Sequence, residues 1–224
     1  MKNLISLKDV SKSIKVGTDA LPILKNIHFD VFKGDLVGIF GKSGSGKSTL
    51  MNMITGIDRP SEGEIWVKGQ SIHLLNESEM ALYRGNNVGI VFQFFQLLPM
   101  LTVLENVIMP MDLCKKYAKA ERKDRAMDLL KKLQIESHAH KYPTTISGGE
   151  QQRTAIARAL ANNPDIIVAD EPTGNLDSVT SSVIFDIFKQ QAEEGKTVII
   201  VTHDNSLKSE FSTCFHMSDG RLIS

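Results

Sequence analysis

The stretch GKSGSGKST, residues 41–49, constrains this chain more than any other part of it. It follows the apolar run LVGIF and precedes LMNMIT, so it lies where a buried strand should pass into a helix. Glycines let a loop wrap its backbone around an anion, and the N–H groups at a helix start attract negative charge. The pattern Gly-x-x-x-x-Gly-Lys-Ser in this context predicts a phosphate-binding loop rather than a flexible turn.

Two side chains of this loop have distinct expected roles. Lys47 should reach the outer phosphates of a nucleoside triphosphate, and the Ser48 hydroxyl should ligate Mg²⁺. The loop residues expected to bind the nucleotide are Gly41, Ser43, Gly44, Ser45, Gly46, Lys47, Ser48 and Thr49.

Adjacent acids end another apolar run, in DIIVADEP, residues 165–172. A carboxylate at the end of a buried parallel strand is the usual complement of a phosphate loop. Asp170 is expected beside the Mg²⁺ ion, and Glu171 is expected to accept a proton from attacking water or to orient that water. The alternative is a strand that ends in a solvated acidic turn, and the phosphate loop makes it the weaker interpretation.

A second candidate anion site begins at ISGGEQQR, residues 146–153, which opens a segment of helical periodicity. Ser147, Gly148 and Gly149 offer a hydroxyl and bare backbone donors at the start of that helix. One protein needs only one cradle for its γ-phosphate, so a second cradle indicates that it serves the nucleotide of another subunit. Taken alone, an ordinary serine N-cap with a glycine entry is an equally open alternative.

The rest of the chain alternates between strand and helix patterns. Polar and apolar residues alternate over residues 27–31, as in a half-buried strand, and EIWVKG, NVGIVFQ and KTVIIVTHD are also predicted strands. Residues 97–163 are predicted to be mainly helical, with a proline break in LTVLENVIMPM, and a further helix is predicted in SVTSSVIFDIFKQQAEEG. Gly56 should end the helix after the phosphate loop, and Asp219-Gly220 predicts a hairpin.

Composition restricts the partners. Lys and Arg total 26, and Asp and Glu total 26, so no global basic charge draws the chain to nucleic acid. No apolar run approaches the roughly 20 residues of a membrane helix, and charged residues interrupt the N-terminus, so the chain itself is expected to be cytoplasmic. Cys114 and Cys214 are expected to be reduced and either buried or idle.

Together, GKSGSGKST, ISGGEQQR and IIVADEP resemble the nucleotide-binding subunit of an ATP-binding cassette (ABC) transporter, over essentially the whole chain. The strings FQFFQLLPMLTVLENV and ADEPTGNLD resemble the macrolide-export and lipoprotein-release subgroup, whose ATPases serve membrane subunits. The resemblance implies the ABC ATPase form of the P-loop NTPase fold: an α/β fold with a RecA-like core sheet, an N-terminal antiparallel β subdomain and a helical insertion. The expected single domain is residues 1–224, with 1–93 and 164–224 as core plus β subdomain and 94–163 as helical subdomain.

The resemblance also implies roles for further residues. Gln93 matches the Q-loop glutamine, which senses the metal and the attacking water, and His203 matches the switch histidine, which contacts the γ-phosphate. A lone histidine after a strand is more often a loop residue than a catalytic one. Only the accompanying motifs make the catalytic interpretation of His203 the stronger. Residues 147–151 match the signature, with Ser147, Gly148, Gly149 and Glu150 expected at the nucleotide, and residues 174–177 match the D-loop, with Asp177 expected there too.

By the same resemblance, the cofactors are ATP and Mg²⁺, and the partners are a second copy of the chain and an integral membrane permease. The two copies would lie head to tail, with each ATP between one chain's phosphate loop and the other's signature. ATP would favour the closed dimer and hydrolysis would reverse that preference. The subunit would sit peripherally on the cytoplasmic face of the cell membrane.

The chain departs from the family at Ile14, where most relatives carry an aromatic residue that stacks on adenine. Stacking of a base on an aromatic side chain contributes about 1–3 kcal/mol. We therefore expect Ile14 to pack aliphatically on the base, and ATP and GTP to be discriminated poorly.

Several interpretations stay open at this level. The stretch FFQLLPMLTV after Gln93 is either the surface that meets the membrane subunit or part of an internal core. His138 and His140 are expected to be exposed loop residues rather than metal ligands. KKYAKAERKDR is expected to be a solvated helix face, with a contact to lipid headgroups as the alternative. The functional alternatives are a regulatory ABC ATPase without transport and a soluble cassette acting on DNA repair or ribosomes. This short, neutral chain lacks the long insertions or second cassette that are usual in the soluble class.

Overall fold

A computed structural model describes residues 3–223, and residues 1–2 and 224 at the ends of the predicted domain lie outside it. The described chain divides into two compact units. One unit runs to Met80 and resumes at Gln191, and the other is Ala81–Gln190. The predicted subdomain boundaries at residues 93/94 and 163/164 differ from this division and stay a prediction.

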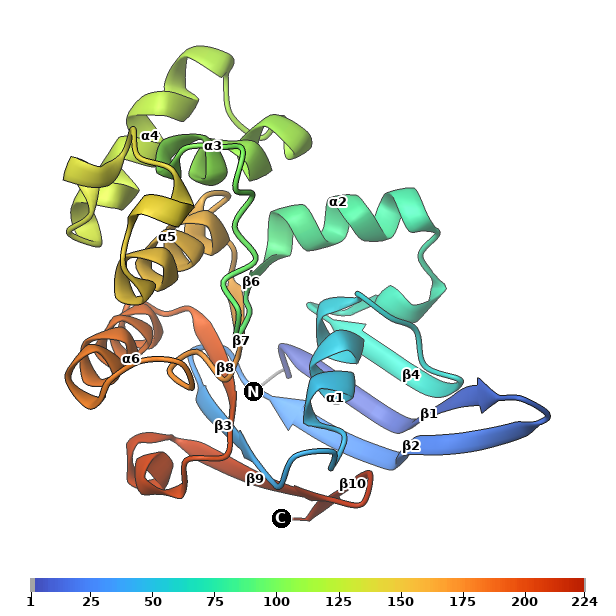
Figure 1. Ribbon diagram of the computed structural model, residues 1–224. Helices are drawn as coiled ribbons and strands as arrows, with labels where there is room; N and C mark the ends of the chain where they lie inside the picture. The colour runs from blue at the N-terminus through green and yellow to red at the C-terminus, as the bar shows by residue number, and fades with distance from the viewer. Residues whose placement is uncertain (1–2, 224) are drawn as a thin grey trace. The chain divides into compact units, whose positions relative to one another are not determined.

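The first unit contains a four-stranded antiparallel sheet. Its strands are β1 (Ile5–Val16), β2 (Asp19–Val31), β4 (Glu62–Val67) and β5 (Gln70–Ser71), in the order β2-β1-β4-β5. Figure 1 shows β1 and β2 as a long two-stranded ribbon with β4 beside β1. The predicted alternation over residues 27–31 is confirmed, because Ile27, Phe29 and Val31 are buried while His28 and Asp30 are exposed.

The same unit holds four strands in the order β10-β9-β3-β8. These are β3 (Leu36–Phe40), β8 (Thr197–Thr202), β9 (Thr213–Ser218) and β10 (Arg221–Ile223). Strand β3 pairs in parallel with both β8 and β9, and β10 is antiparallel to β9. The predicted hairpin turn is confirmed, since Asp219 and Gly220 both adopt the left-handed conformation, with φ of 50° and 76°.

Helix α1 (Lys47–Thr55) follows β3 after the glycine-rich loop. Its apolar residues pack inward, with Leu50, Met51, Met53 and Ile54 buried. Gly56 caps its C-terminus in the left-handed conformation, as predicted, and its N–H reaches the last carbonyls of the helix.

The second unit contains the parallel pair β6 (Val88–Val91) and β7 (Ile166–Asp170) and three helices that pack on one another. The helices are α3 (Val103–Cys114), α4 (Lys119–Lys132) and α5 (Gly148–Leu160), and α5 also packs on β6. The predicted proline break is wrong, because Pro110 lies inside α3. Pro110 has no N–H to donate to the carbonyl of Asn106, and its own carbonyl accepts a bond from Asn162 Nδ2.

Two helices cross the boundary between the units: α2 (Glu77–Asn87) and α6 (Ser178–Glu193). Helix α2 was not among the predicted elements, although a local signal marks its start. Asn76 and Glu79 form a reciprocal pair in which each side chain accepts from the other's backbone N–H.

The remaining elements are four short 3₁₀ helices: η1 (Ile72–Leu74), η2 (Glu136–His138), η3 (Pro143–Thr145) and η4 (Asn205–Glu210). Parallel strands with intervening helices and a separate antiparallel sheet confirm the predicted α/β class. Over residues 3–223, no helix has both the length and the apolar character needed to cross a membrane.

Candidate active site

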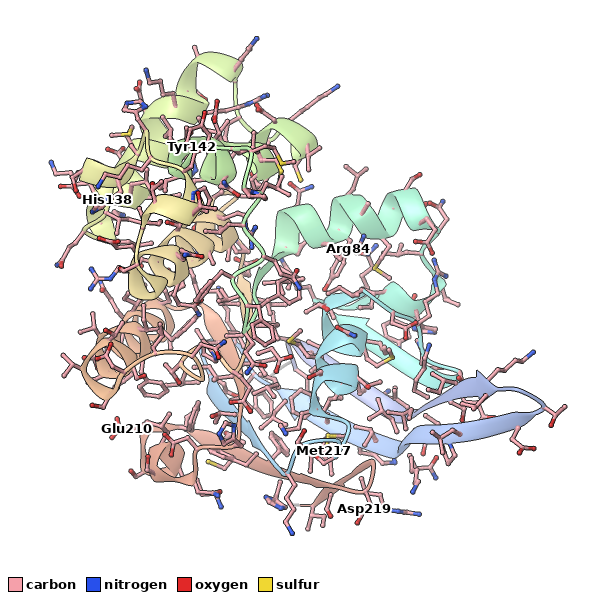
Figure 2. All side chains as sticks on the ribbon, viewed as in Figure 1. Arg84, His138, Tyr142, Glu210, Met217 and Asp219 are labelled. Atoms are coloured by element: carbon pink, nitrogen blue, oxygen red, sulfur yellow. The ribbon has the colours of Figure 1, made fainter. Side chains whose placement is uncertain are left out.

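The phosphate loop has the backbone that its glycines predict. Gly44 and Gly46 have φ of 77° and 104°, a region that side-chain-bearing residues rarely adopt. A Cβ added at Gly41 would lie 2.3 Å from the carbonyl oxygen of Met217, on β9, so a larger residue does not fit there. Figure 2 labels Met217 and Asp219 in the β9–β10 hairpin, and the Gly220 N–H of this hairpin donates to the Ser45 carbonyl of the loop at 3.1 Å. The loop is thus held in a narrow turn between β3 and α1.

Lys47 is positioned by the loop that it belongs to. Its side chain is buried, and its Nζ donates to the carbonyl oxygens of Gly41, at 2.8 Å, and Lys42, at 2.9 Å. Ser45 Oγ is also buried and has no hydrogen-bond partner among the described residues. Gly46, the N-cap of α1, offers no side-chain acceptor to the N–H groups of the first turn. A buried cation, an unpaired hydroxyl and uncapped N–H donors together fit a phosphate chain.

The pairing of β3 with β8 places His203 near the phosphate loop. Phe40 at the end of β3 pairs with Thr202 at the end of β8, so Gly41 and His203 are the next residues on neighbouring strands. His203 is exposed. The parallel register therefore brings the switch-histidine position to the same sheet edge as the start of the phosphate loop.

The second unit gathers Gln93, Asp170 and Glu171 in the same way. Val91 on β6 pairs with Ala169 on β7. Asp170 is the last residue of β7, Glu171 follows it, and Gln93 lies two residues after the end of β6. A Cβ added at Gly174 would lie 3.5 Å from Gln93 Nε2 and 3.6 Å from Glu171 Cβ, so both side chains border that glycine. The amide of Asn175 donates to the Gln93 carbonyl at 3.0 Å. An amide and a carboxylate at one strand edge can orient and deprotonate a water molecule.

Ser147 forms the N-cap of α5, so the capping alternative is confirmed as the local structure. Its hydroxyl accepts from the Glu150 N–H, and the Glu150 carboxylate accepts from the Ser147 N–H at 2.7 Å and hydroxyl at 2.8 Å. Bonds from the backbone and side chain of Ser147 lower the pKa of Glu150, with smaller contributions from His138 and Lys141. The carboxylate is therefore ionised at neutral pH and keeps the hydroxyl oriented.

The prediction of two exposed loop histidines is wrong for His138 and correct for His140. His138 is half-buried, and its Nε2 lies 2.9 Å from Glu150 Oε1. The packing of η2 against the start of α5 creates this pair, which the sequence pattern does not encode. His140 is exposed in the loop that follows.

Asp177 caps α6. Its carboxylate accepts from Thr180 Oγ1, at 2.6 Å, and from the backbone N–H groups of Val179 and Thr180. The bonds from Thr180 lower the pKa of Asp177 most strongly. Gly149 lies close to this cap, since a Cβ added there would be 2.8 Å from Thr180 Cγ2. The D-loop and the signature thus pack together within the second unit.

The predicted metal-binding residues supply oxygen donors. The Ser48 hydroxyl, the Asp170 carboxylate and the Gln93 amide are hard ligands of the kind that Mg²⁺ prefers, and Mg²⁺ usually keeps several water ligands besides one or two from protein. All three side chains are at least partly solvent-accessible. In donor chemistry, Ser48 in the first unit and Gln93 and Asp170 in the second each suit Mg²⁺.

Comparison with known proteins identifies the family of this chain. The sequence pattern of the ABC transporter family matches residues 24–174. The ABC transporter ATP-binding protein MJ0796 of Methanocaldococcus jannaschii is 44% identical, over 98% of this chain and 95% of that protein. This chain belongs to the ABC transporter family as an ATP-binding, ATP-hydrolysing subunit. The predicted family is therefore confirmed.

A solved structure of MJ0796 and one further relative refine this assignment. A dimeric structure of MJ0796 in a post-hydrolysis state, bound to ADP and Pi, has a TM-score of 0.91 at 42% identity, over 98% of this chain and 97% of that one. The lipoprotein-releasing system ATP-binding protein LolD of Francisella tularensis is 41% identical, over 98% of this chain and 95% of LolD. The second relative agrees with the predicted subgroup.

The ABC subunit exposes much of the stretch that follows Gln93. Phe94 and Met100 are 73% and 71% exposed and Leu98 is 37% exposed, so the internal-core alternative is wrong for these residues. Phe95 is half-buried. Asn106, fully buried on α3, holds this loop by accepting from the Leu98 N–H and donating to the Leu98 carbonyl.

Sequence reasoning missed three supporting residues of this ABC subunit: Asn175, Arg158 and Gln152. Arg158 on α5 donates to the carbonyl oxygens of Phe95 and Gln96, two residues with left-handed φ of 56° and 49°. Burial lowers the pKa of Arg158. Asn175 and Gln152 lie inside the D-loop and ISGGEQQR stretches, but the contacts of all three side chains could not be predicted, because their partners lie far away along the sequence.

The two cysteines are free thiols. Cys114 is half-buried and Cys214 is exposed, so neither thiol is fully buried. The described geometry assigns neither of them to the candidate site.

Proposed function

We propose that two copies of this subunit close around ATP and thereby drive a separate integral membrane permease. One observation carries the proposal: two glycine-containing stretches open a helix, the phosphate loop before α1 and the start of α5, where Ser147 and Glu150 form a capping box. We take both helix starts as cradles for anions. Each copy needs only one cradle for its own phosphate chain, so the second is free to serve a partner copy. The dimeric structure of the relative MJ0796 supports this arrangement.

The proposed roles follow from the side-chain chemistry. The Lys47 ammonium would neutralise the outer phosphate oxygens, and His203 would hydrogen-bond the γ-phosphate. Gln93 would orient the attacking water, and Glu171 would take its proton as the water oxygen bonds to phosphorus and ADP leaves. Bound Mg²⁺, held through Ser48, Gln93 and Asp170, would supply charge neutralisation at the β- and γ-phosphates. Ser147, Gly148, Gly149, Glu150 and Asp177 would act on the nucleotide of the partner copy.

The exposed apolar residues after Gln93 are the proposed contact with the permease. Phe94, Leu98 and Met100 lie on one loop. Tyr142 is half exposed, and the carbonyl of its neighbour Lys141 accepts from the N–H of Val103, which begins the helix after this loop. Figure 2 labels Tyr142. Exposed aromatic and apolar side chains of this kind mark protein interfaces. This surface would hold the subunit peripherally on the cytoplasmic face of the membrane.

We expect Phe94→Asp to abolish association with membranes without unfolding the chain. The side chain is 73% exposed, so the change should alter the free energy of unfolding by no more than about 0.5 kcal/mol. The measurement is the distribution of the tagged subunit between soluble and membrane fractions of its native cells, with thermal unfolding in parallel. Val179→Asp, at a side chain 74% exposed elsewhere in the same unit, is the control for added charge. Unchanged membrane association of the Phe94 variant would contradict the proposed contact.

Ile14 is the proposed contact with the base. It pairs across the β1–β2 ribbon with Leu21, and both side chains are about half exposed, at 45% and 51%. We expect Ile14→Tyr to tighten ATP binding about 5- to 100-fold, because stacking contributes about 1–3 kcal/mol. Titration with ATP and GTP measures both affinity and discrimination. Val16→Tyr, at an exposed position on the same strand, is the matched control, and equal effects of the two changes would argue against a base contact at Ile14.

A further inference from the structure

Gln152 is a fully buried polar side chain on α5 that the described mechanism does not use. Its Nε2 donates to the carbonyl oxygen of Pro172 at 2.7 Å. A carbonyl can only accept, so the orientation of the amide is determined by this bond. Pro172 directly follows Glu171, and the bond therefore ends at the turn that holds the proposed catalytic carboxylate.

Gln152 Oε1 is buried and has no hydrogen-bond partner among the described residues. An unpaired buried acceptor is unfavourable, and an apolar side chain of similar volume would avoid that penalty. The unpaired Oε1 costs free energy of folding, and the hydrogen bond from Nε2 to the Pro172 carbonyl offsets that cost.

The turn that receives this bond has a demanding backbone. Glu171 has φ of 46°, a left-handed conformation that is uncommon for residues other than glycine. Its carbonyl oxygen accepts from the Gly174 N–H at 3.1 Å, which closes the turn around Pro172. The bond from Gln152 anchors the middle of this turn to a helix. Without it, the Pro172 carbonyl would be buried with one donor fewer, and the direction of the Glu171 side chain would be less restricted.

We propose that Gln152 is a positioning residue that ties the Glu171 turn to the signature helix α5. The proposal rests on the proposed function, because it takes Glu171 as the base. Ser147 caps the same helix, and Gly149 packs against Thr180 beyond the turn. A displacement of the signature end of α5, caused by the nucleotide of the partner copy, is thereby passed to the residue that activates water for the chain's own nucleotide.

The test is a double-mutant cycle on ATP turnover by the full chain, with Gln152→Met, Glu171→Gln and the combination. Methionine keeps the volume and flexibility of the side chain but removes the donor. We expect Gln152→Met to lower kcat roughly 10- to 100-fold, the effect of a small misplacement of a catalytic group, while the Kd for ATP changes less than about twofold. In the Glu171→Gln background, the same change should lower kcat less than about twofold further, because both changes remove one function.

Asn162→Leu is the matched control for loss of a buried amide. Asn162 is 3% exposed, its Nδ2 donates to the carbonyl oxygens of Gly85 and Pro110, and its Oδ1 is likewise without a partner among the described residues. Both carbonyl acceptors of its amide lie outside the Glu171 turn. We expect this variant to lower the unfolding midpoint at least as much as Gln152→Met does, with kcat within about threefold of wild type.

The outcomes separate the two proposals. If Glu171→Gln lowers kcat but Gln152→Met does not, or if the two effects multiply, Gln152 is a structural residue and the inference is overturned while the proposed function stands. If Glu171→Gln leaves kcat unchanged, the proposed role of Glu171 fails and the positioning role of Gln152 fails with it. A loss of kcat in Gln152→Met that Asn162→Leu reproduces would also overturn the inference.

Discussion

Replacing Glu171 with Gln should lower ATP turnover about 10²- to 10⁴-fold while ATP binding is retained, because the variant loses the proposed general base. The amide keeps the size and hydrogen-bonding shape of the carboxylate but cannot take a proton from water at neutral pH. The residue stands at the end of β7, beside Gln93 across Gly174, so the change should not disturb the strand edge. The variant should therefore accumulate in its ATP-bound state.

Light scattering of this variant with Mg-ATP, with Mg-ADP and without nucleotide measures that accumulation. A dimer that forms only with Mg-ATP is the expected result. Glu62→Gln, at an exposed position at the start of β4, is the control and should hydrolyse ATP at the wild-type rate. Wild-type turnover by the Glu171 variant would remove it from the mechanism, and a variant that binds ATP but stays monomeric would contradict dimer closure by this chain alone.

Lys47→Ala should weaken ATP binding about 10- to 100-fold, since a hydrogen bond to a charged group contributes about 1.5–3 kcal/mol. The Lys47 ammonium is buried and held by two carbonyl oxygens of its own loop, which restricts it to the volume beside the loop before nucleotide arrives. Little conformational freedom is then lost on binding. Calorimetric or fluorescence titration of ATP against the purified chain is the measurement.

Lys33→Ala is the control for this change, because Lys33 is an exposed residue in the turn between β2 and β3. Its substitution should leave the Kd for ATP within about twofold of wild type. Far-ultraviolet circular dichroism should show both variants folded. An unchanged Kd in the Lys47 variant would contradict the proposed phosphate contact.

The local features of the fold were predictable because they depend on neighbouring residues. The strand–loop–helix around residues 41–49, the alternation at residues 27–31 and the Asp219-Gly220 hairpin all follow from periodicity and backbone preference. The start of α2 carries a comparable local signal, the capping pair Asn76 and Glu79, so this helix was predictable from the sequence as well. The break at Pro110 was wrong because packing of α3 outweighed a local propensity.

Some features of the candidate site were likewise predictable from the sequence, and others were not. Lys47, Asp170 and Glu171 could be named from their motifs, since a phosphate loop and its acidic complement are contiguous patterns, whereas the signature residues were implied by the family resemblance. Whether Phe94 lies in a core or on the surface could not be decided, because an apolar run has the same composition in either place. The exposure of that side chain comes from tertiary packing.

The sequence alone determined the family, the phosphate loop, the acidic strand end and the α/β class. Each of these depends on contiguous motifs or on the periodicity of neighbouring residues. Only the tertiary structure decided that His138 pairs with Glu150, that Arg158 holds the carbonyls after Gln93, and that the Gln152 amide reaches Pro172. Each of these contacts joins residues that are distant in sequence. They form only when helix packing and strand register bring specific atoms within hydrogen-bond distance, and no local periodicity encodes that arrangement.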